Sequence, residues 1–415
     1  MANFQKVKLK DVTTKIGSGA TPRGGKDSYH KGGIPLIRSL NVYDLSFDYS
    51  NLAFIDEVQA KKLENVAIEK DDVLLNITGA SVCRCTSVPK NLVPARVNQH
   101  VSIIRADKKN LLGGYLKYVL VSPVYKRELY GLARTGATRE ALTKIDIEKF
   151  EVRLPNFQTQ ARIFSVLSNY DDLIENNEKR IKALEEMAQL LYTEWFVRFK
   201  FPGHKKVKMV DSGTEYGMIP EEWEIGSISL LANVISGFPF KGSTYQDSGK
   251  YKIVTIKNVH DGKFVLNFDS FIDELPSKLS ATCILKRGDV LLSLTGNVGR
   301  ICVVYGQNHV LNQRVAKLDP IEKNRREYIY SLFRQKRFQQ KLEAMSNGAA
   351  QQNLSPIQVK DIKVVIPKSE ILDEFSRLVG KYFDLLLSLQ EENQNLSKTR
   401  DLLILQLVTG KRELK

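Results

Sequence analysis

One ordered set of motifs occurs twice in this chain of 415 residues. The segment DVLLNITG at Asp72–Gly79 returns as DVLLSLTG at Asp289–Gly296, and the Asn-Gln pair at Asn98 returns at Asn312. Matching motifs lie roughly 210–220 residues apart, whereas solenoid repeats recur about every 20–50 residues. The sequence therefore predicts two copies of one domain, with small loop deletions in one copy.

Both copies follow the same order of expected elements. Short strands and glycine-rich loops come first, and the apolar runs Val73–Leu75 and Val290–Leu292 then predict buried strands closed by Thr-Gly turns. Glu151–Pro155 and Lys363–Pro367 predict short strands that stop at proline. The copies agree best near their ends and differ in their middles, which indicates one scaffold that carries two specificities.

A long helix is predicted after each copy, from about Gln158 to Phe196 and from about Glu370 to Leu407. Apolar residues recur every seven positions in both, which favours a coiled-coil seam over an amphipathic helix packed on its own domain. The predicted seam residues are Ile174, Ile181, Leu184, Leu191, Leu386, Leu389, Leu396 and Leu403. Asn177 and Asn393 also fall on the seams and would help to fix their register, and Arg400 lies on the second seam.

The predicted fold class is α+β: two duplicated mixed α/β domains separated by two long helices, which form an antiparallel coiled coil with pseudo-two-fold symmetry. The expected boundaries are 1–156 (first domain), 157–200 (central helix), 201–220 (a polar, basic linker), 221–368 (second domain) and 369–415 (C-terminal helix). About 25 residues of packed helix span roughly 37 Å. That length is close to one turn of B-DNA, about 34 Å.

The balance of charge points to a polyanionic partner. Lys and Arg number 62 against 47 Asp and Glu, a formal net charge of +15. Apolar runs fall short of the roughly 18 residues of a membrane-spanning helix, and the first residues show no apolar signal core, so we expect a cytoplasmic protein. Four cysteines exclude a disulfide scaffold, and their spacing favours buried thiols over a metal site.

The motifs of common catalytic sites are missing from the sequence. Gly237–Thr244 resembles a phosphate-binding loop but lacks the Lys after its second glycine, and no G-x-G-x-x-G follows a predicted strand. Asp273 and Glu274 with Lys278 imitate a nuclease cluster, but we interpret them as a solvated loop. The five histidines are scattered. We therefore expect a protein that binds without catalysis.

Side chains suited to nucleic acid occur in the predicted loops of both copies. Arg and Lys reach phosphate and guanine, whereas Asn and Gln pair with adenine. The candidate DNA-binding residues are Arg23, Lys26, Arg38, Arg84, Arg134 and Arg139 in the first domain, and Lys241, Lys257, Asn297, Arg300, Gln351 and Gln352 in the second. The repeated Asn98-Gln99 and Asn312-Gln313 are better explained as structural, because residues that read different bases should differ between the copies.

Seven segments spread along the chain form a recognisable set: GSGATP (17–22), GGIPLI (32–37), EWFVRF (194–199), GMIPEEW (217–223), SGFPFK (236–241), GDVLLSLTGNVGR (288–300) and LNQRV (311–315). With them, the chain resembles over nearly its whole length the specificity subunit of Type I restriction–modification systems. Each piece is weakly specific, but their order and the duplication make the resemblance specific. The loops Thr78–Ser81 and Thr295–Gly299 differ in sequence, so we do not expect equivalent roles for them.

The resemblance implies two target recognition domains that each read one half of a bipartite site in double-stranded DNA. It implies that the helices act as a ruler and as docking surfaces for two modification subunits, and that restriction subunits join this core. Neither a cofactor nor a metal would bind to this chain: S-adenosylmethionine would belong to the modification subunits, and ATP and Mg to the restriction subunits.

Two other function classes stay open at this point. A standalone DNA methyltransferase or nuclease with an unfamiliar site would bind its methyl donor or cut DNA without partners. A structural scaffold joined through coiled coils would confer no sequence preference on any partner.

Overall fold

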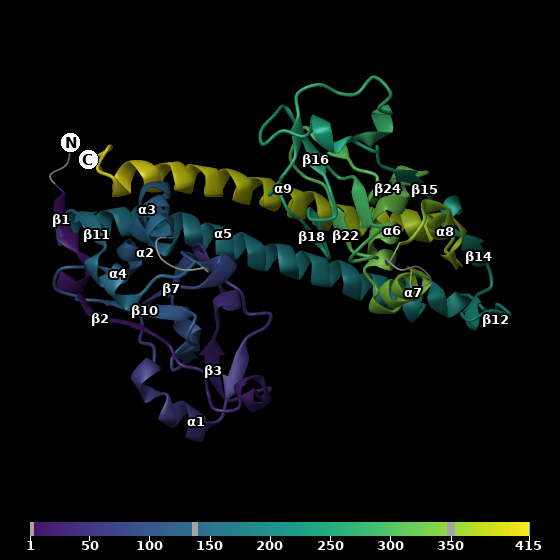
Figure 1. The fold of residues 1–415 in the computed structure, drawn as a ribbon. Coiled ribbons are helices and arrows are strands. Elements are labelled where there is room, and N and C mark those ends of the chain that lie inside the picture. Colours follow the sequence, from purple (N-terminus) through teal and green to yellow (C-terminus); the bar gives the residue numbers. More distant parts are fainter. Residues whose placement is uncertain (1–3, 135–139, 347–352, 415) are drawn as a thin grey trace. The chain divides into compact units, whose positions relative to one another are not determined.

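The computed structural model describes residues 4–134, 140–346 and 353–414. The chain divides into two compact units, the first made of residues 1–175 with 395–415 and the second of residues 176–394 (Figure 1). Each unit thus combines one copy of the repeat with parts of both long helices.

A four-stranded antiparallel sheet lies at the centre of the first unit. Its strands, in spatial order, are β2 (Thr13–Ser18), β10 (Val101–Ala106), β7 (Val73–Asn76) and β8 (Cys85–Ser87). Every residue of β7 is buried, which confirms the strand predicted from its apolar run. Around this sheet lie β6 (Ala53–Ile55), β3 (Ile34–Ile37) and β9 (Arg96–Val97) in a second sheet, the pair β1 (Gln5–Lys8) and β11 (Glu151–Leu154), and the hairpin β4 (Val42–Tyr43) and β5 (Ser46–Phe47). The short helices are α1 (Glu57–Lys62), α2 (Gly113–Val121), α3 (Pro123–Arg134) and α4 (Lys144–Lys149).

The second unit repeats this topology. Its central sheet runs β15 (Ala232–Ser236), β24 (Val315–Pro320), β21 (Val290–Ser293) and β22 (Ile301–Val303), and β21 is again buried at every residue. The remaining strands are β19 (Phe271–Ile272), β16 (Tyr251–Val254), β23 (His309–Leu311) and β20 (Ile284–Leu285) in one sheet, and the pairs β14 (Glu224–Ser227) with β25 (Lys363–Ile366) and β17 (Val259–His260) with β18 (Lys263–Phe264). The helices are α6 (Arg326–Phe333), α7 (Lys336–Ser346) and α8 (Pro356–Asp361). The duplication of one mixed domain is thereby confirmed.

Residues 201–220, which we predict as a linker, carry local structure of their own. Strands β12 (Met209–Asp211) and β13 (Met218–Pro220) pair as a hairpin. Gly213 and Gly217 adopt left-handed backbone angles in its turn, which glycine tolerates without a steric cost. Phe201 is buried against Trp223, with their ring centroids 5.0 Å apart.

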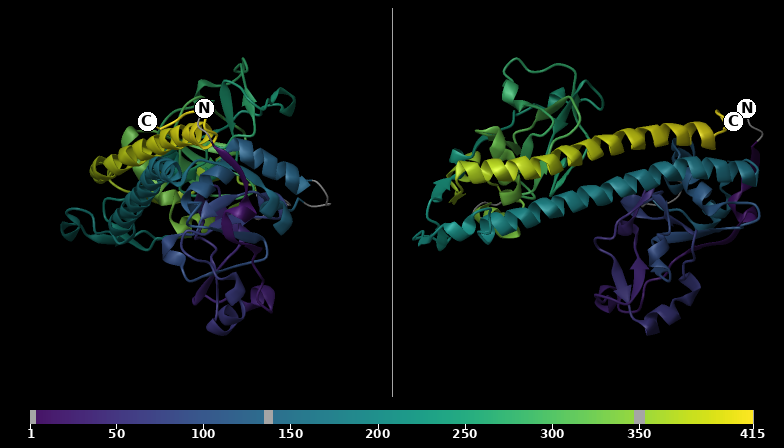
Figure 2. Two further views of the ribbon diagram at one scale, coloured as in Figure 1. Left: turned by 90° about the vertical axis from the view of Figure 1, so that its left-hand side faces the viewer. Right: turned by 180° about the vertical axis from the view of Figure 1, so that it is seen from behind.

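The two long helices α5 (Phe157–Tyr192) and α9 (Ser369–Val408) pass through both units and run antiparallel (Figures 1 and 2). Within the second unit, Asn177 contacts Asn393, while Tyr192 lies against Phe375. Helix α5 ends at Tyr192, four residues before its predicted end at Phe196, because Thr193–Val197 continue as a wider π-helical turn. The predicted fold class, two copies of a mixed domain with two long antiparallel helices, is confirmed.

Polar contacts join the helix seam at two points. In the second unit, Asn177 is 3% exposed, and its side-chain amide donates to Asn393 Oδ1 at 3.0 Å and to Glu392 Oε2 at 3.2 Å. This confirms that the two seam asparagines meet. In the first unit, Arg400 donates to Asp171 at 2.9 Å, and the same carboxylate accepts hydrogen bonds from Lys117 and Tyr118 of α2. Arg400 therefore fits on the seam because its charge is paired.

The predicted seam residues are buried or half-buried in the unit to which each belongs. Leu386 and Leu389 are buried, and the other six are partly covered. Each core also takes side chains from both helices. Ile163 and Leu167 of α5 share the core of the first unit with Ile404 and Leu407 of α9. Among the described residues, no helix is both long enough and apolar enough to span a bilayer.

We expect Asn177→Ala to lower the free energy of unfolding by about 1–2 kcal/mol, because the half-buried amide of Asn393 loses the hydrogen bond that the buried Asn177 donates. The double variant Asn177→Leu/Asn393→Leu should regain most of that stability, since it removes both polar groups together. Urea unfolding of the four forms of the double-mutant cycle measures this coupling. Asn176→Ala, at an exposed neighbour on the same helix, is the matched control; an equal loss for that variant would contradict a specific role for Asn177.

His309 lies in the apolar core of the second unit. Its ring stacks on Phe268 at 5.2 Å and meets the edge of Phe264, and the residue is fully buried. Nε2 lies 3.0 Å from the carbonyl oxygen of Tyr305, so it carries the proton and donates. Burial lowers the pKa of His309 to about 4.

The stability of the second unit should therefore fall in mild acid. Between pH 7 and pH 5 the unfolded imidazole takes up a proton near its ordinary pKa of about 6.5, while the buried one stays neutral. This difference should cost about 2 kcal/mol of unfolding free energy at pH 5. Denaturant unfolding of His309→Phe at both pH values should show a smaller loss than the parent, while His30→Gln, at an exposed position, should match it. An unchanged pH dependence in His309→Phe would contradict the assignment.

Candidate nucleic-acid interface

Three loops meet at the same end of the central sheet in each unit. In the first unit these are Gly19–Arg23 after β2, Asn98–His100 before β10, and Ile77–Arg84 between β7 and β8. The strand pairing Ser18↔Ser102 and Asn76↔Val101 brings them together. In the second unit the same three places hold Gly237–Lys241, Asn312–Arg314 and Leu294–Arg300. We call each group the loop end of its unit.

A glycine is required where the first loop crosses the second. A Cβ on Gly19 would lie 2.0 Å from the carbonyl oxygen of Val97, and one on Gly237 would lie 2.3 Å from that of Asn312. Real side chains do not approach so closely, so both positions exclude any residue with a Cβ. The two copies therefore keep one backbone crossing, which the GSG and SGF segments of the sequence encode.

The repeated asparagines hold the second loop in place. Asn98 Oδ1 accepts the backbone N–H of His100 at 3.2 Å, and Asn312 Oδ1 accepts that of Arg314 at 3.2 Å. Both asparagines are buried. The prediction that the Asn-Gln pairs are structural is confirmed for the two asparagines, because their side chains turn the backbone and do not face solvent. Gln99 and Gln313 are exposed, and for them it stays a prediction.

The third loop differs between the copies in one partly buried contact. Thr78 Oγ1 lies 2.7 Å from His100 Nδ1 in the first unit. His100 is replaced by Arg314 in the second unit, and the buried Thr295 Oγ1 has no hydrogen-bond partner there among the described residues. The backbone is nevertheless the same, because Ile77 donates to His100 as Leu294 donates to Arg314.

Four of the six candidate residues of the first unit have described side chains. Arg23 is exposed, while Arg38 follows β3, whose Ile37 accepts a hydrogen bond from Asn98. The guanidinium of Arg38 lies 5.2 Å from the ring centroid of Tyr29, and that of Arg84 lies 4.5 Å from that of Tyr43. Arg134 ends α3 and pairs with Glu140 at 2.9 Å. The side chain of Lys26 and all of Arg139 lie outside the described residues.

In the second unit the described candidates differ in exposure and in whether an ion pair is seen. Lys257 forms an ion pair with Asp269 at 2.7 Å. Lys241 and Asn297 are exposed, and Arg300 is half-buried beside the β21–β22 turn. Gln351 and Gln352 lie outside the described residues. A DNA-binding role for these residues in both units stays a prediction.

Sequence reasoning did not select Tyr29 and Tyr43, although each holds a candidate arginine. Stacking on an aromatic ring fixes the plane of a guanidinium and leaves N–H groups at its edge able to donate. In Arg38 one guanidinium nitrogen, Nη2, already donates to the carbonyl of Asn51. No motif marks these tyrosines in the sequence, because they come next to the arginines only when separate loops meet.

The four cysteines are free and buried, as their spacing predicted. Burial raises the pKa of the Cys83 thiol to about 12 and raises those of Cys85, Cys283 and Cys302 as well. They therefore stay protonated at neutral pH and act as small apolar side chains. The described ranges contain no group of three or more His, Cys, Asp or Glu residues placed to hold a metal ion.

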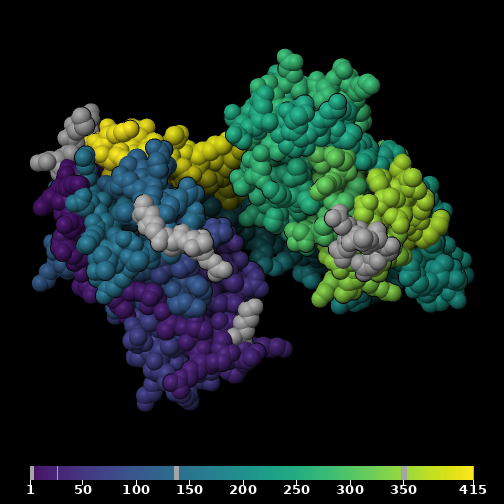
Figure 3. All heavy atoms as spheres, in the orientation of Figure 1, coloured from purple at the N-terminus to yellow at the C-terminus, as the bar shows by residue number. Residues whose placement is uncertain are grey.

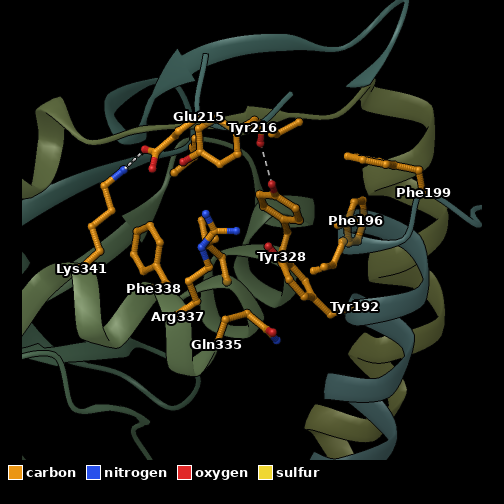
Figure 4. Close-up of a pocket in the computed structure, with 14 residues that line it drawn as sticks. Tyr192, Phe196, Phe199, Glu215, Tyr216, Tyr328, Gln335, Arg337, Phe338 and Lys341 are labelled. Atoms are coloured by element: carbon orange, nitrogen blue, oxygen red, sulfur yellow. Dashed lines mark hydrogen bonds and ion pairs between the residues drawn. The ribbon is translucent and has the colours of Figure 1, made fainter. Parts of the chain in front are cut away.

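A separate pocket of about 240 Å³ opens in the second unit at the π-helical end of α5 (Figure 4). Aromatic rings from α5, the linker hairpin and α6 line it, among them Tyr192, Phe196 and Tyr328. The hydroxyls of Tyr216 and Tyr328 donate to the carbonyls of Lys363 and Val365, each at 2.6 Å. These hydroxyls therefore bind the pocket wall to strand β25 and do not face the cavity as ligand groups.

Comparisons with known proteins agree with this geometry. The family model described as Type I restriction modification DNA specificity domain matches residues 1–186 and 220–395. The Type I restriction enzyme MjaIX specificity subunit of Methanocaldococcus jannaschii is 26% identical over 97% of this chain and 92% of its own length. The HindI specificity subunit of Haemophilus influenzae is 22% identical over 99% of this chain and 100% of its own length.

A solved structure has a similar fold. The crystal structure of a Type I restriction–modification S subunit from M. genitalium superposes with a TM-score of 0.58 at 15% identity, covering 98% of this chain and 96% of the other. This likeness supports the fold, and the family match takes in most of both repeats. The chain therefore belongs to the Type I restriction–modification DNA specificity family.

Proposed function

We propose that this chain is the non-catalytic subunit that selects the DNA sequence for a Type I restriction–modification complex. Each unit would read one half of a bipartite target, and the paired helices would set the length of the unread spacer. The observation that carries the proposal is a constant loop scaffold with different exposed residues. Gly19 and Gly237 make the same backbone crossing in the two units, yet the third loop exposes Asn297 in the second copy alone.

The charge of the chain supports a DNA partner. A formal net charge of +15 favours association with a polyanion, and candidate cations lie at the loop end of each unit. Phosphates would position each unit, and base edges in the grooves would supply sequence preference.

The chemistry of modification and cleavage would lie on partner subunits. In this proposal S-adenosylmethionine binds to two modification subunits, and ATP and Mg bind to restriction subunits. The complex would act in the cytoplasm, where its DNA substrate lies.

Replacing the first repeat with that of a relative, with α5 and α9 kept, should change one half of the recognised sequence and leave the other half and the spacer intact. The physical reason is that each repeat forms its own sheets and loops. Sequencing of methylated positions after assembly with modification subunits measures the outcome. A change in both halves, or in neither, would contradict the assignment of one half-site to each unit.

The docking of modification subunits is supported by apolar side chains that remain exposed on the long helices. Leu402 in the first unit is 62% exposed, and Leu190 in the second is 66% exposed. The C-terminal part of α9, drawn in yellow, is open at the surface of the first unit (Figure 3). The exposed faces of the long helices are therefore partly apolar. Such groups bury favourably against a partner at about 25 cal/mol per Å².

Leu190→Glu and Leu402→Glu should each weaken binding of modification subunits at least about tenfold, which corresponds to about 1.4 kcal/mol. Both positions are exposed, so the isolated chain should keep its stability. Sedimentation or light scattering of mixtures with modification subunits gives the affinity. Asn176→Glu and Asn395→Glu add the same charge at exposed polar positions of α5 and α9; equal weakening by these controls would speak against an apolar docking surface.

A further inference from the structure

Two loop positions carry a cation in both units. The first is Arg84 in one unit and Arg300 in the other. An alignment that starts from the Thr-Gly pair sets Cys83 against Arg300, because the first loop is one residue longer. Strand register gives a different answer: Leu75 pairs with Cys85, and Leu292 pairs with Ile301, so each arginine directly precedes its strand.

Backbone hydrogen bonds confirm this equivalence. Asn76 donates to the carbonyl of Arg84 at 2.8 Å, and Ser293 donates to that of Arg300 at 2.9 Å. Cys83 has a positive φ of 66°, as Gly299 has one of 83°. Cys83 thereby takes the place of the turn glycine. Both arginines lie outside Thr78–Ser81 and Thr295–Gly299, the segments for which we do not expect equivalent roles, and that expectation stays a prediction.

The second shared position is Arg23 in one unit and Lys241 in the other. Each lies four residues after the glycine of the backbone crossing. Ala20 donates to Val97 at 3.0 Å, and Phe238 donates to Leu311 at 2.8 Å, so the two chains leave the crossing in the same way. The 3₁₀ turn that follows begins at Gly25 in the first unit and one position earlier relative to the crossing, at Gly242, in the second. Both side chains are exposed, and within the described part of the chain neither forms an ion pair.

Other candidate positions differ between the units even though their backbones match. Arg38 donates its backbone N–H to Asn41, and Thr255 donates to Asn258 in the same way. The position that holds Arg38 over the Tyr29 ring in the first unit thus holds Thr255 in the second. A cation stacked at this point exists in one copy and has no counterpart in the other.

We propose that Arg23, Arg84, Lys241 and Arg300, the shared cations, bind DNA phosphates, while Arg38 reads bases in one half-site. This inference rests on the proposed function and names the residues through which it works. Phosphates are the same in every half-site, whereas bases differ. A cation that recurs at matching loop positions in both units suits the constant part of the ligand, the phosphate backbone. Phosphate also accepts either Arg or Lys, as at the Arg23 and Lys241 position, whereas bidentate recognition of a base does not.

The test uses the complete complex with modification subunits and compares Arg84→Gln, Arg300→Gln, Arg23→Gln and Lys241→Gln with the parent. Binding to the methylated target and to targets altered in either half-site is measured across salt concentrations. Each variant should lower the slope of log K against log salt by about 0.9, the value for one phosphate contact. Each should weaken all duplexes by the same factor, so that the ratio between correct and altered targets stays constant.

Arg38→Gln should behave in the opposite way. It should lower the ratio of binding between the correct target and targets altered in one half-site by about tenfold or more. Arg84→Lys should restore the salt slope, which separates charge from structural damage, because the half-buried Arg84 also packs on Tyr43. Lys398→Gln removes one charge from an exposed site on α9 and should leave the slope unchanged.

An altered base preference in Arg84→Gln or Arg300→Gln, or an unchanged slope in all four variants, would overturn the inference. Failure of the parent complex to prefer any sequence would instead overturn the proposed function. The two failures are distinguishable because the second is seen before any variant is made.

Discussion

Each repeat depends on a helix that begins in the other repeat. The core of the first unit contains Ile404, Leu407 and Val408, which lie at the end of α9. The core of the second unit contains Tyr192 and Trp195, which lie at the end of α5 and its π-helical turn. Removing either helix end would expose apolar surface in a unit assembled mainly from the other half of the chain. This exchange is the constraint on which both sheets and both loop ends depend.

Polar groups decide how the helices align within that apolar contact. An apolar seam alone tolerates several registers, because one leucine replaces another at little cost. The paired amides of Asn177 and Asn393 satisfy each other in only one alignment, as do the charges of Asp171 and Arg400. These contacts add less to stability than apolar burial does, and they select one register among several.

Much of the fold follows from the sequence because it depends on periodicity and repetition. The apolar runs at Val73 and Val290, the seven-residue recurrence and the seam asparagines each act through local spacing. The linker hairpin and the π-helical turn could not be predicted from the sequence, because both depend on the aromatic packing of Phe196, Phe201 and Trp223.

The sequence predicts which residue types lie at the candidate interface, but it does not show which loop positions of the two units are equivalent. Basic loop residues are visible in the sequence, yet the match of Arg84 with Arg300 is hidden by one inserted residue. Strand pairing reveals it, because the hydrogen-bonded register does not count loop residues. The stacking of Arg38 on Tyr29 and of Arg84 on Tyr43 was out of reach because no sequence motif marks these tyrosines, and the second ring comes from a loop distant in the chain.

Because each unit needs the end of a helix that begins in the other, the order of synthesis affects when each unit can fold. The ribosome completes residues 1–175 long before residues 395–415, yet these two segments form one compact unit. The emerging N-terminal half must therefore wait, with part of its interior uncovered, until translation has passed the last turns of α9. The portion of the polypeptide made first is consequently among the last to reach its native state.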